Sequence, residues 1–160
     1  MRLRDSAMSL LLAGVILAVP VGMTFAAQQS PADAIKARQQ HMKDLGGANK
    51  AINDQLKADA PDMAAIKEAA AKGAAAAKEV GSLFPKGSGT EAGVETAAKP
   101  EIWAQPADFK AAADKLVAEE NKMVQVAATG DKAAIADQIK AVGGACGDCH
   151  KVFRVPPKRN

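Results

Sequence analysis

The sequence contains no tyrosine, only 3% of its residues are aromatic, and alanine is abundant. Aromatic residues favour strands and alanine is the strongest helix former, so this composition favours helices over strands. The lysines are interleaved with acidic residues instead of clustering beside aromatic side chains, which argues against nucleic-acid binding. A chain of this size supports one core and one domain.

Long apolar runs are also scarce, because residues 8–23 form the one extended stretch without charges. The run follows two arginines and precedes Ala26 and Ala27, which is the layout of a secretory signal peptide. An uncleaved membrane anchor is the alternative, but the run is shorter than the roughly 20 residues that a spanning helix needs. We therefore expect residues 1–27 to be a signal peptide. Residues 28–160 would then form a soluble periplasmic domain that does not contact the membrane.

Four segments of the expected domain show helical periodicity. The first opens with Ser30-Pro31, a capping serine followed by proline at the first helical position. The other three begin near residues 59–62, 106–108 and 131. Steps of three and four separate the inward residues of the first helix, as in helices packed almost parallel to their neighbours. These inward residues are Ile35, Arg38, Met42, Leu45, Asn49, Ile52 and Leu56.

The connection between the second and third helices, residues 81–105, is long and rich in glycine and proline. Phe84 and Trp103 stand near its ends as apolar anchors, so we expect a loop that wraps over the helices. The other two connections are short, which makes the helices that they join antiparallel. The expected fold is all-α: an up-down-up-down four-helix bundle with one long loop.

Cysteine is scarce as well, since Cys146 and Cys149 are the only two in the chain. A disulfide closing two intervening residues would add almost no stability. With His150 they fit Cys-x-x-Cys-His, the attachment signal for c-type haem. On a helix the two thiols and the imidazole lie within about one turn, so both sulfurs can form thioethers while the imidazole reaches the iron.

Two other interpretations of this motif are weaker. A thioredoxin-like pair stands at the start of a helix beside a sheet, whereas this pair is near a helix end. A structural zinc site needs about four ligands, and only Asp148 and His41 could be added. A haem-free helical adaptor with a disulfide or metal clip remains an alternative. Haem would account for Gly143 and Gly144 one turn before the motif, although these glycines also fit a weak helix.

Three groups of residues make the chain resemble the class II cytochromes c, the family that includes cytochrome c prime. They are Arg38-Gln39 with Met42-Lys43, then Pro100-Glu101-Ile102-Trp103, and finally the Cys146, Cys149 and His150 motif with Phe153-Arg154. The resemblance spans essentially the whole expected domain. It implies a left-twisted four-helix bundle carrying one covalent haem c.

The resemblance also implies roles for individual residues. Cys146 and Cys149 would hold the haem, and His150 would be the proximal iron ligand. The other cofactor-binding candidates are Arg38 and Gln39 near the propionates or ring edge, Arg154 beside the proximal imidazole, and Phe84 and Phe153.

Met42 falls at the position that the family places over the other haem face. In one branch a distal methionine ligates the iron of a low-spin electron carrier, and in the other an apolar side chain leaves a five-coordinate iron that binds nitric oxide or carbon monoxide. Methionine is a soft ligand that raises the reduction potential, but it is also a common gap-filler in cores. We expect ligation, because Met42 shares the inward stripe with Arg38. A second imidazole ligand, His41, would give a bis-histidine haem, but His41 is rotated by about 100° from Met42 and is expected at the surface.

The main functional prediction is therefore a periplasmic one-electron carrier, not an enzyme, that exchanges electrons with redox partner proteins. The alternative is a five-coordinate gas-binding protein. Small residues on the second helix would permit a homodimer through the first two helices, but a monomeric bundle would use them equally well.

Overall fold

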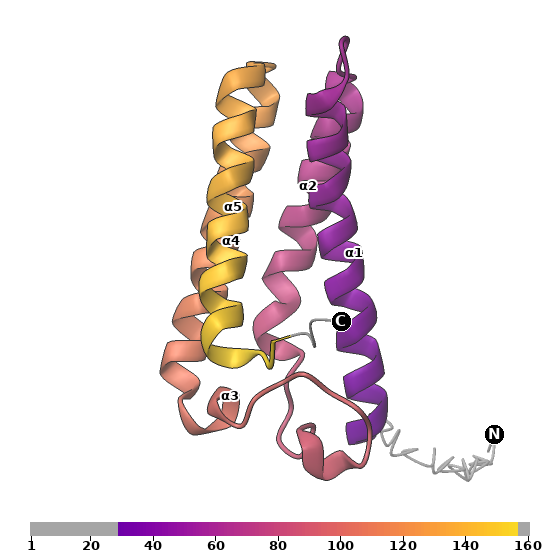
Figure 1. Cartoon of the computed structure of the whole chain (residues 1–160), viewed down its shortest axis with the longest axis vertical. Helices are drawn as coiled ribbons and strands as arrows, with labels where there is room; N and C mark the ends of the chain where they lie inside the picture. Colours follow the sequence, from indigo (N-terminus) through magenta and orange to yellow (C-terminus); the bar gives the residue numbers. More distant parts are fainter. Residues whose placement is uncertain (1–28, 157–160) are drawn as a thin grey trace, which may run out of the picture.

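The computed structural model describes residues 29–156, so the expected signal peptide of residues 1–27 lies outside the described part. Four long helices run side by side (Figure 1): α1 Pro31–Lys57, α2 Met63–Glu79, α4 Pro106–Thr129 and α5 Lys132–Phe153. α1 packs along α2, α2 along α4, and α4 along α5, whereas α1 and α5 approach each other only sparsely. The predicted antiparallel four-helix bundle is confirmed.

Short-range capping interactions explain where the long helices begin. Ser30 Oγ accepts a hydrogen bond from the backbone N–H of Asp33 at 3.1 Å, at the start of α1. Asp62 and Asp131 each accept from two backbone N–H groups in the first turns of α2 and α5. Gly130 ends α4 with φ +73°, a left-handed conformation that glycine adopts without strain.

The core lies along the bundle axis and is built from the inward stripes of the long helices. α2 contributes mainly small side chains there, so α4 can approach it closely. The largest side chains with less than 2% exposure are Ile35, Ile52, Ile66, Met123, Glu120, Ile135 and Val142. Glu120 is the charged residue in this set.

The long loop closes the end of the bundle at which α1 and α4 begin (Figure 1). It contains three short helical turns that the sequence did not predict: η1 Val80–Ser82, η2 Thr90–Ala92 and α3 Glu101–Ala104. Trp103 Nε1 donates to the carbonyl of Phe84 at 3.0 Å, which ties the two ends of the loop together. The backbone N–H of Lys99 donates to the Phe153 carbonyl at 3.0 Å, so the loop is also fixed to the end of α5.

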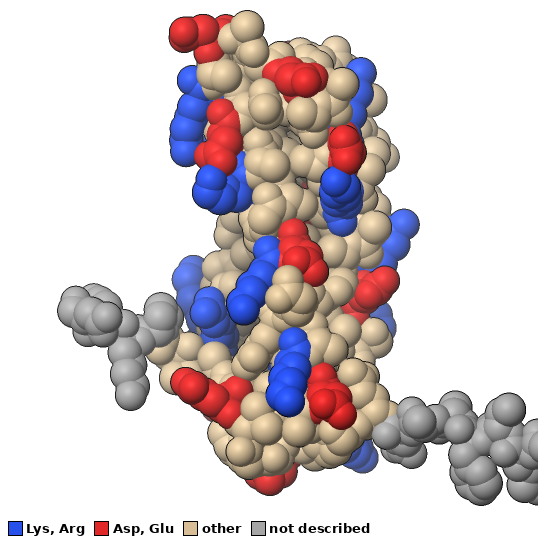
Figure 2. All heavy atoms as spheres, turned by 90° about the vertical axis from the view of Figure 1, so that its right-hand side faces the viewer, with Lys and Arg blue, Asp and Glu red and all other residues tan. Residues whose placement is uncertain are grey.

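The surface carries acidic and basic side chains in alternation. Figure 2 shows both signs interspersed over one face of the bundle. Several are paired within one helix, such as Lys72 with Glu68 at 2.7 Å and Lys110 with Asp114 at 2.6 Å. Such exposed pairs contribute little stability. Among residues 29–156 there is no helix with the length and apolar character needed to cross a membrane.

Candidate cofactor site

Cys146, Cys149 and His150 lie in the last two turns of α5, on the part of the helix that meets the loop. Cys146 packs against the main core, together with Met42 of α1. Cys149 packs against a second, smaller cluster built around Phe109 and Phe153. The motif therefore stands where the bundle core and the packing beneath the loop meet.

Both thiols are partly buried, and this environment controls their ionisation. The pKa of Cys149 lies above the ordinary cysteine value because burial disfavours the thiolate. The pKa of Cys146 is raised mainly by burial and further by the negative charges of Glu120 and Cys149. The two side chains are thus held as thiols, which is the form that adds across a vinyl group.

His150 occupies a different face of α5 from the one that meets α4. Asp148 marks the α4 side, because its carboxylate pairs with Lys115 at 2.8 Å. His150 is rotated by about 200° from Asp148, since each residue of a helix advances about 100°. Gly143 and Gly147 precede His150 by seven and three residues, so all three share one face.

This glycine face is open. A Cβ built on Gly143, Gly144 or Gly147 would meet nothing within 4 Å among the described atoms. α5 and α1 also approach each other only sparsely. The helix therefore offers room beside His150 for a flat group larger than a side chain.

Arg154 lies next to the proximal-ligand candidate. Its backbone N–H donates to the His150 carbonyl at 3.1 Å. His150 is exposed overall, but the surrounding protein removes enough water from the ring to lower its pKa, and the positive charge of Arg154 lowers the pKa further. The predicted role of Arg154 beside a haem-ligating imidazole stays a prediction.

Arg38 is buried with 3% exposure and is held by the loop. Its guanidinium donates to Ser88 Oγ at 2.8 Å and to Thr96 Oγ1 at 2.6 Å. Gln39, the next residue, is exposed and donates to the Glu95 carbonyl at 2.9 Å. Both side chains thus anchor the loop to α1, and their predicted contact with haem propionates stays a prediction.

Phe84 and Phe153, the two aromatic candidates, belong to one cluster. The Phe109 ring lies between them, at centroid distances of 4.9 Å from Phe84 and 5.3 Å from Phe153, edge to face in both cases. Cys149 packs against this cluster, so the structure brings both predicted aromatic residues to the attachment motif.

Met42 is half-buried and packs on the same core cluster as Cys146. Its thioether is therefore in apolar surroundings on the α1 side of the bundle. The expectation that His41 lies at the surface is wrong: its side chain is only 18% exposed, and Nε2 lies 2.8 Å from the Ala76 carbonyl oxygen. The His41 side chain points toward α2, whereas the neighbouring Met42 packs against the core.

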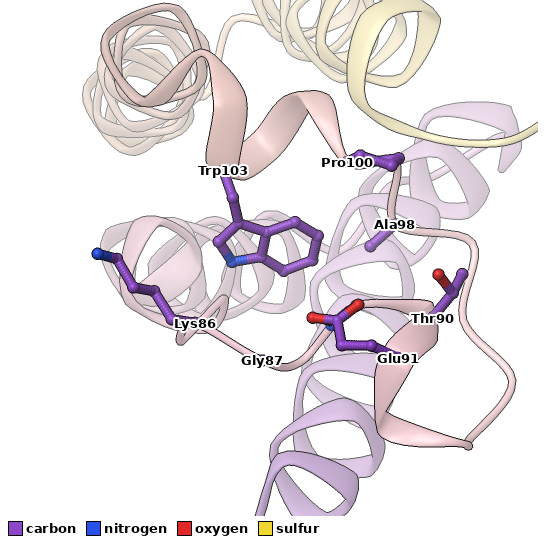
Figure 3. A pocket seen from close by; sticks show the side chains of 8 residues that line it. Lys86, Gly87, Thr90, Glu91, Ala98, Pro100 and Trp103 are labelled. Atoms are coloured by element: carbon purple, nitrogen blue, oxygen red, sulfur yellow. The ribbon is translucent and has the colours of Figure 1, made fainter.

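Two shallow hollows mark the surface near this end of the bundle. One, of about 320 Å³, lies between α4 and α5 and is lined by Cys149 and Phe153 among others. The other, of about 300 Å³, is formed by the loop, and Figure 3 shows Trp103 and Glu91 at its rim. The loop hollow does not include the predicted cofactor residues in its lining, so we do not assign the cofactor there.

The residues present fit a covalently attached haem. Two thiols and one imidazole lie within about one helical turn, and a glycine face beside them leaves open space. The two neighbouring clusters consist of apolar side chains, and the buried Arg38 supplies a positive charge on the α1 side. These features match an apolar macrocycle that carries acidic groups at its edge.

Sequence reasoning missed one buried charged residue, Glu120. Glu120 of α4 has 0% exposure, and its Oε1 accepts from Asn49 Nδ2 at 2.7 Å. The spacing contained the signal, because Glu120 follows Leu116 by four residues and precedes Met123 by three. Asn49 was predicted to point inward, and this contact confirms it.

Comparisons with known proteins agree with this geometry. A family model described as Cytochrome C' matches residues 33–154. The chain is 33% identical over 115 residues to cytochrome c-556 from Agrobacterium tumefaciens (strain apple 185), which covers 71% of this chain and 88% of that protein.

Two solved structures extend the similarity to the fold. A cytochrome c' with ligand-controlled dimer dissociation superimposes with a TM-score of 0.75 at 30% identity, covering 81% of this chain and all of the other. A nitric oxide complex of a cytochrome c prime variant from Alcaligenes xylosoxidans superimposes with a TM-score of 0.71 at 26% identity, covering 79% and 98%.

Proposed function

The chain belongs to the cytochrome c' family, whose members bind haem c covalently, and we propose that it binds nitric oxide or carbon monoxide at that haem. Attachment would use Cys146 and Cys149, with each S–H adding across one vinyl group to form a thioether. His150, on the same turn, would be the proximal ligand. When bound, the haem supplies an iron that exchanges one electron and binds a diatomic ligand at an open position.

The observation that carries this proposal is the packing of Met42. Its side chain is part of an apolar cluster that also contains Cys146, so it would cover the distal face as a packed hydrophobic group. A small uncharged gas can enter such surroundings more easily than a charged ligand can, because burying a charge is costly. The similarity to a solved nitric oxide complex supports the same interpretation.

Electron transfer with Met42 as a sixth ligand is the second candidate. Its support is that Met42 shares the inward stripe of α1 with Arg38. A methionine ligand would stabilise the ferrous state and raise the reduction potential.

The optical spectrum of the reduced protein, with and without carbon monoxide, separates the two candidates. For gas binding we expect a high-spin spectrum that shifts on adding the gas, in wild type and in Met42→Leu alike. A low-spin spectrum that is indifferent to carbon monoxide, and that becomes high-spin in Met42→Leu, would support the electron carrier instead. Mass spectrometry of the denatured protein tests attachment separately, because a thioether-linked haem is retained.

We propose further that the chain is exported to the periplasm by residues 1–27 and pairs through α1 and α2. In either candidate the haem iron would exchange single electrons with partner proteins, without transforming a substrate. Gly46 and Gly47 are exposed on α1, and a Cβ on either would meet nothing within 4 Å, so a second copy could approach closely. The dimer dissociation described for a similar cytochrome c' makes sedimentation with and without carbon monoxide the appropriate test.

A further inference from the structure

Glu120 stands in the middle of the bundle, facing three other helices. Asn49 approaches from α1 and Gly73 from α2. On the α5 side lies Cys146, which packs against the cluster that contains Leu116 and Met123, the α4 neighbours of Glu120. None of these groups carries a compensating positive charge.

The hydrogen bonds between Asn49 and Glu120 are incomplete if the Glu120 carboxyl is ionised. Asn49 Nδ2 donates to Glu120 Oε1 at 2.7 Å. The two remaining oxygens, Asn49 Oδ1 and Glu120 Oε2, are buried and have no hydrogen-bond partner among residues 29–156. Both are acceptors when the carboxylate is charged, so neither can satisfy the other. A protonated carboxyl removes this difficulty, because it carries one O–H donor.

The surroundings favour the protonated form. Burial raises the pKa of Glu120 above its ordinary value, and the hydrogen bond from Asn49 opposes this rise only in part. Gly73 adds a steric restriction, since a Cβ at this position would lie 2.6 Å from Glu120 Oε2. The absence of a side chain in the middle of α2 therefore makes room for the carboxyl.

We infer that Glu120 is a proton-binding site that forms a two-bond ring with Asn49: Nδ2–H donates to Oε1, and the acid O–H donates to Oδ1. The ring satisfies both oxygens that lack partners. It requires no haem, and it is therefore independent of the proposed function.

We extend this inference to the reduction potential of the haem, and this step rests on the proposed function. Glu120 lies between Leu116 and Met123 on α4, and Cys146 packs against the cluster that contains both. The Glu120 charge accordingly contributes to the raised pKa of the Cys146 thiol. With a haem held at Cys146, one electron from a redox partner would lower the positive charge near Cys146 by one, so the nearby Glu120 carboxylate would bind protons more tightly. In the pH range in which Glu120 is ionised before reduction, it would then take one proton from solvent and release that proton when an acceptor removes the electron.

Infrared spectroscopy of the full-length holoprotein tests the protonated state directly. Over a series of pH values we expect a carbonyl stretch of a protonated carboxylic acid that persists above the pH at which exposed carboxyl groups ionise, is absent in Glu120→Gln and is shifted in Asn49→Ala. Glu119→Gln is the matched control, because Glu119 is the adjacent residue and accepts from Gln138 at 2.8 Å. A band that persists unchanged in Glu120→Gln would overturn the acid–amide ring.

Redox titration over a range of pH tests the coupling. We expect the wild-type potential to fall as pH rises through the interval in which Glu120 titrates, and Glu119→Gln to behave in the same way. Glu120→Gln should lose this dependence. An equal dependence of the potential on pH in Glu120→Gln would overturn the coupling. Absence of the haem mass from the denatured protein would overturn the proposed function, but it would leave the infrared test of the acid–amide ring valid.

Discussion

The guanidinium carbon of Arg38 lies 4.8 Å from the centroid of the Phe84 ring, which joins α1 to the segment that follows α2. The same guanidinium donates to Ser88 and Thr96, two residues of the loop. Burial lowers the pKa of Arg38 from its very high ordinary value, while the negative charge of Glu91 raises it. Arg38 therefore remains charged, and a buried charge needs these partners.

Replacing Arg38 with leucine should destabilise the loop and the bundle end beneath it. Hydrogen bonds to charged groups contribute about 1.5–3 kcal/mol each, so we expect the free energy of unfolding to fall by an amount of that order. Gln39→Ala is the matched control on the same turn, because the Gln39 bond is exposed and neutral. Denaturant titrations measure both, and equal losses would show that Arg38 does not anchor the loop.

The contrast between Arg38 and its partners shows how far the sequence could predict this site. Steps of three and four residues predict that Arg38 and Asn49 point inward, and both are confirmed because helical periodicity is a local property. Ser88 and Thr96 lie 50 and 58 residues farther along the chain, in an irregular loop. No local pattern specifies such a contact, so the loop geometry could not be predicted.

The motif around Cys146 was predictable for a different reason. Its chemistry depends on spacing within one helix, which the sequence displays directly. The partners across the bundle depend on how four helices pack, and Glu120 was missed for that reason. The partial burial of His41 was missed too, because its carbonyl partner at Ala76 belongs to another helix.

Phe109 is the central ring of the aromatic cluster, so its truncation should be among the most damaging changes near the attachment motif. For Phe109→Ala we expect a loss of about 3–5 kcal/mol, from lost burial and the cavity left behind. Phe109→Leu should cost less, because it keeps most of the volume but loses both edge-to-face contacts with Phe84 and Phe153. Thermal unfolding of the two variants checks the order, and a reversed order would contradict this role.

Asp131 caps the helix that carries the attachment motif. Its Oδ1 accepts from the backbone N–H groups of Ala133 at 2.9 Å and Ala134 at 3.2 Å. Asp131→Ala should therefore lower the free energy of unfolding by about 1 kcal/mol. Asp137→Ala is the control on the same helix, since Asp137 makes an exposed pair with Lys140 that should matter much less. Similar losses in urea titrations would mean that the cap is unimportant.

Glu120 should make stability depend on pH in a defined direction. Its pKa in the folded state is raised by burial, so the folded protein binds this proton more tightly than the unfolded chain does. The stabilisation is complete below the ordinary value of 4.5 and is lost as pH rises through the folded-state pKa. Glu120→Gln, which resembles the neutral acid, should remove this dependence. Urea titrations at several pH values compare the slopes, and an unchanged slope would contradict the assignment.

Gly73 and Glu120 should be energetically coupled. A Cβ at residue 73 would lie 2.6 Å from Glu120 Oε2, so Gly73→Ala must displace a buried carboxyl and its bond with Asn49. In a helix interior free of such a contact, replacing glycine with alanine stabilises by about 1 kcal/mol. We therefore expect Gly73→Ala to destabilise the wild type but to stabilise, or to cost much less, in a Glu120→Ala background. A double-mutant cycle measures the difference, which should lie in the range of about 0.5–3 kcal/mol typical of residues in contact. Additive effects would show that the Glu120 carboxyl moves aside without cost. Gly73 would then not be needed to accommodate Glu120.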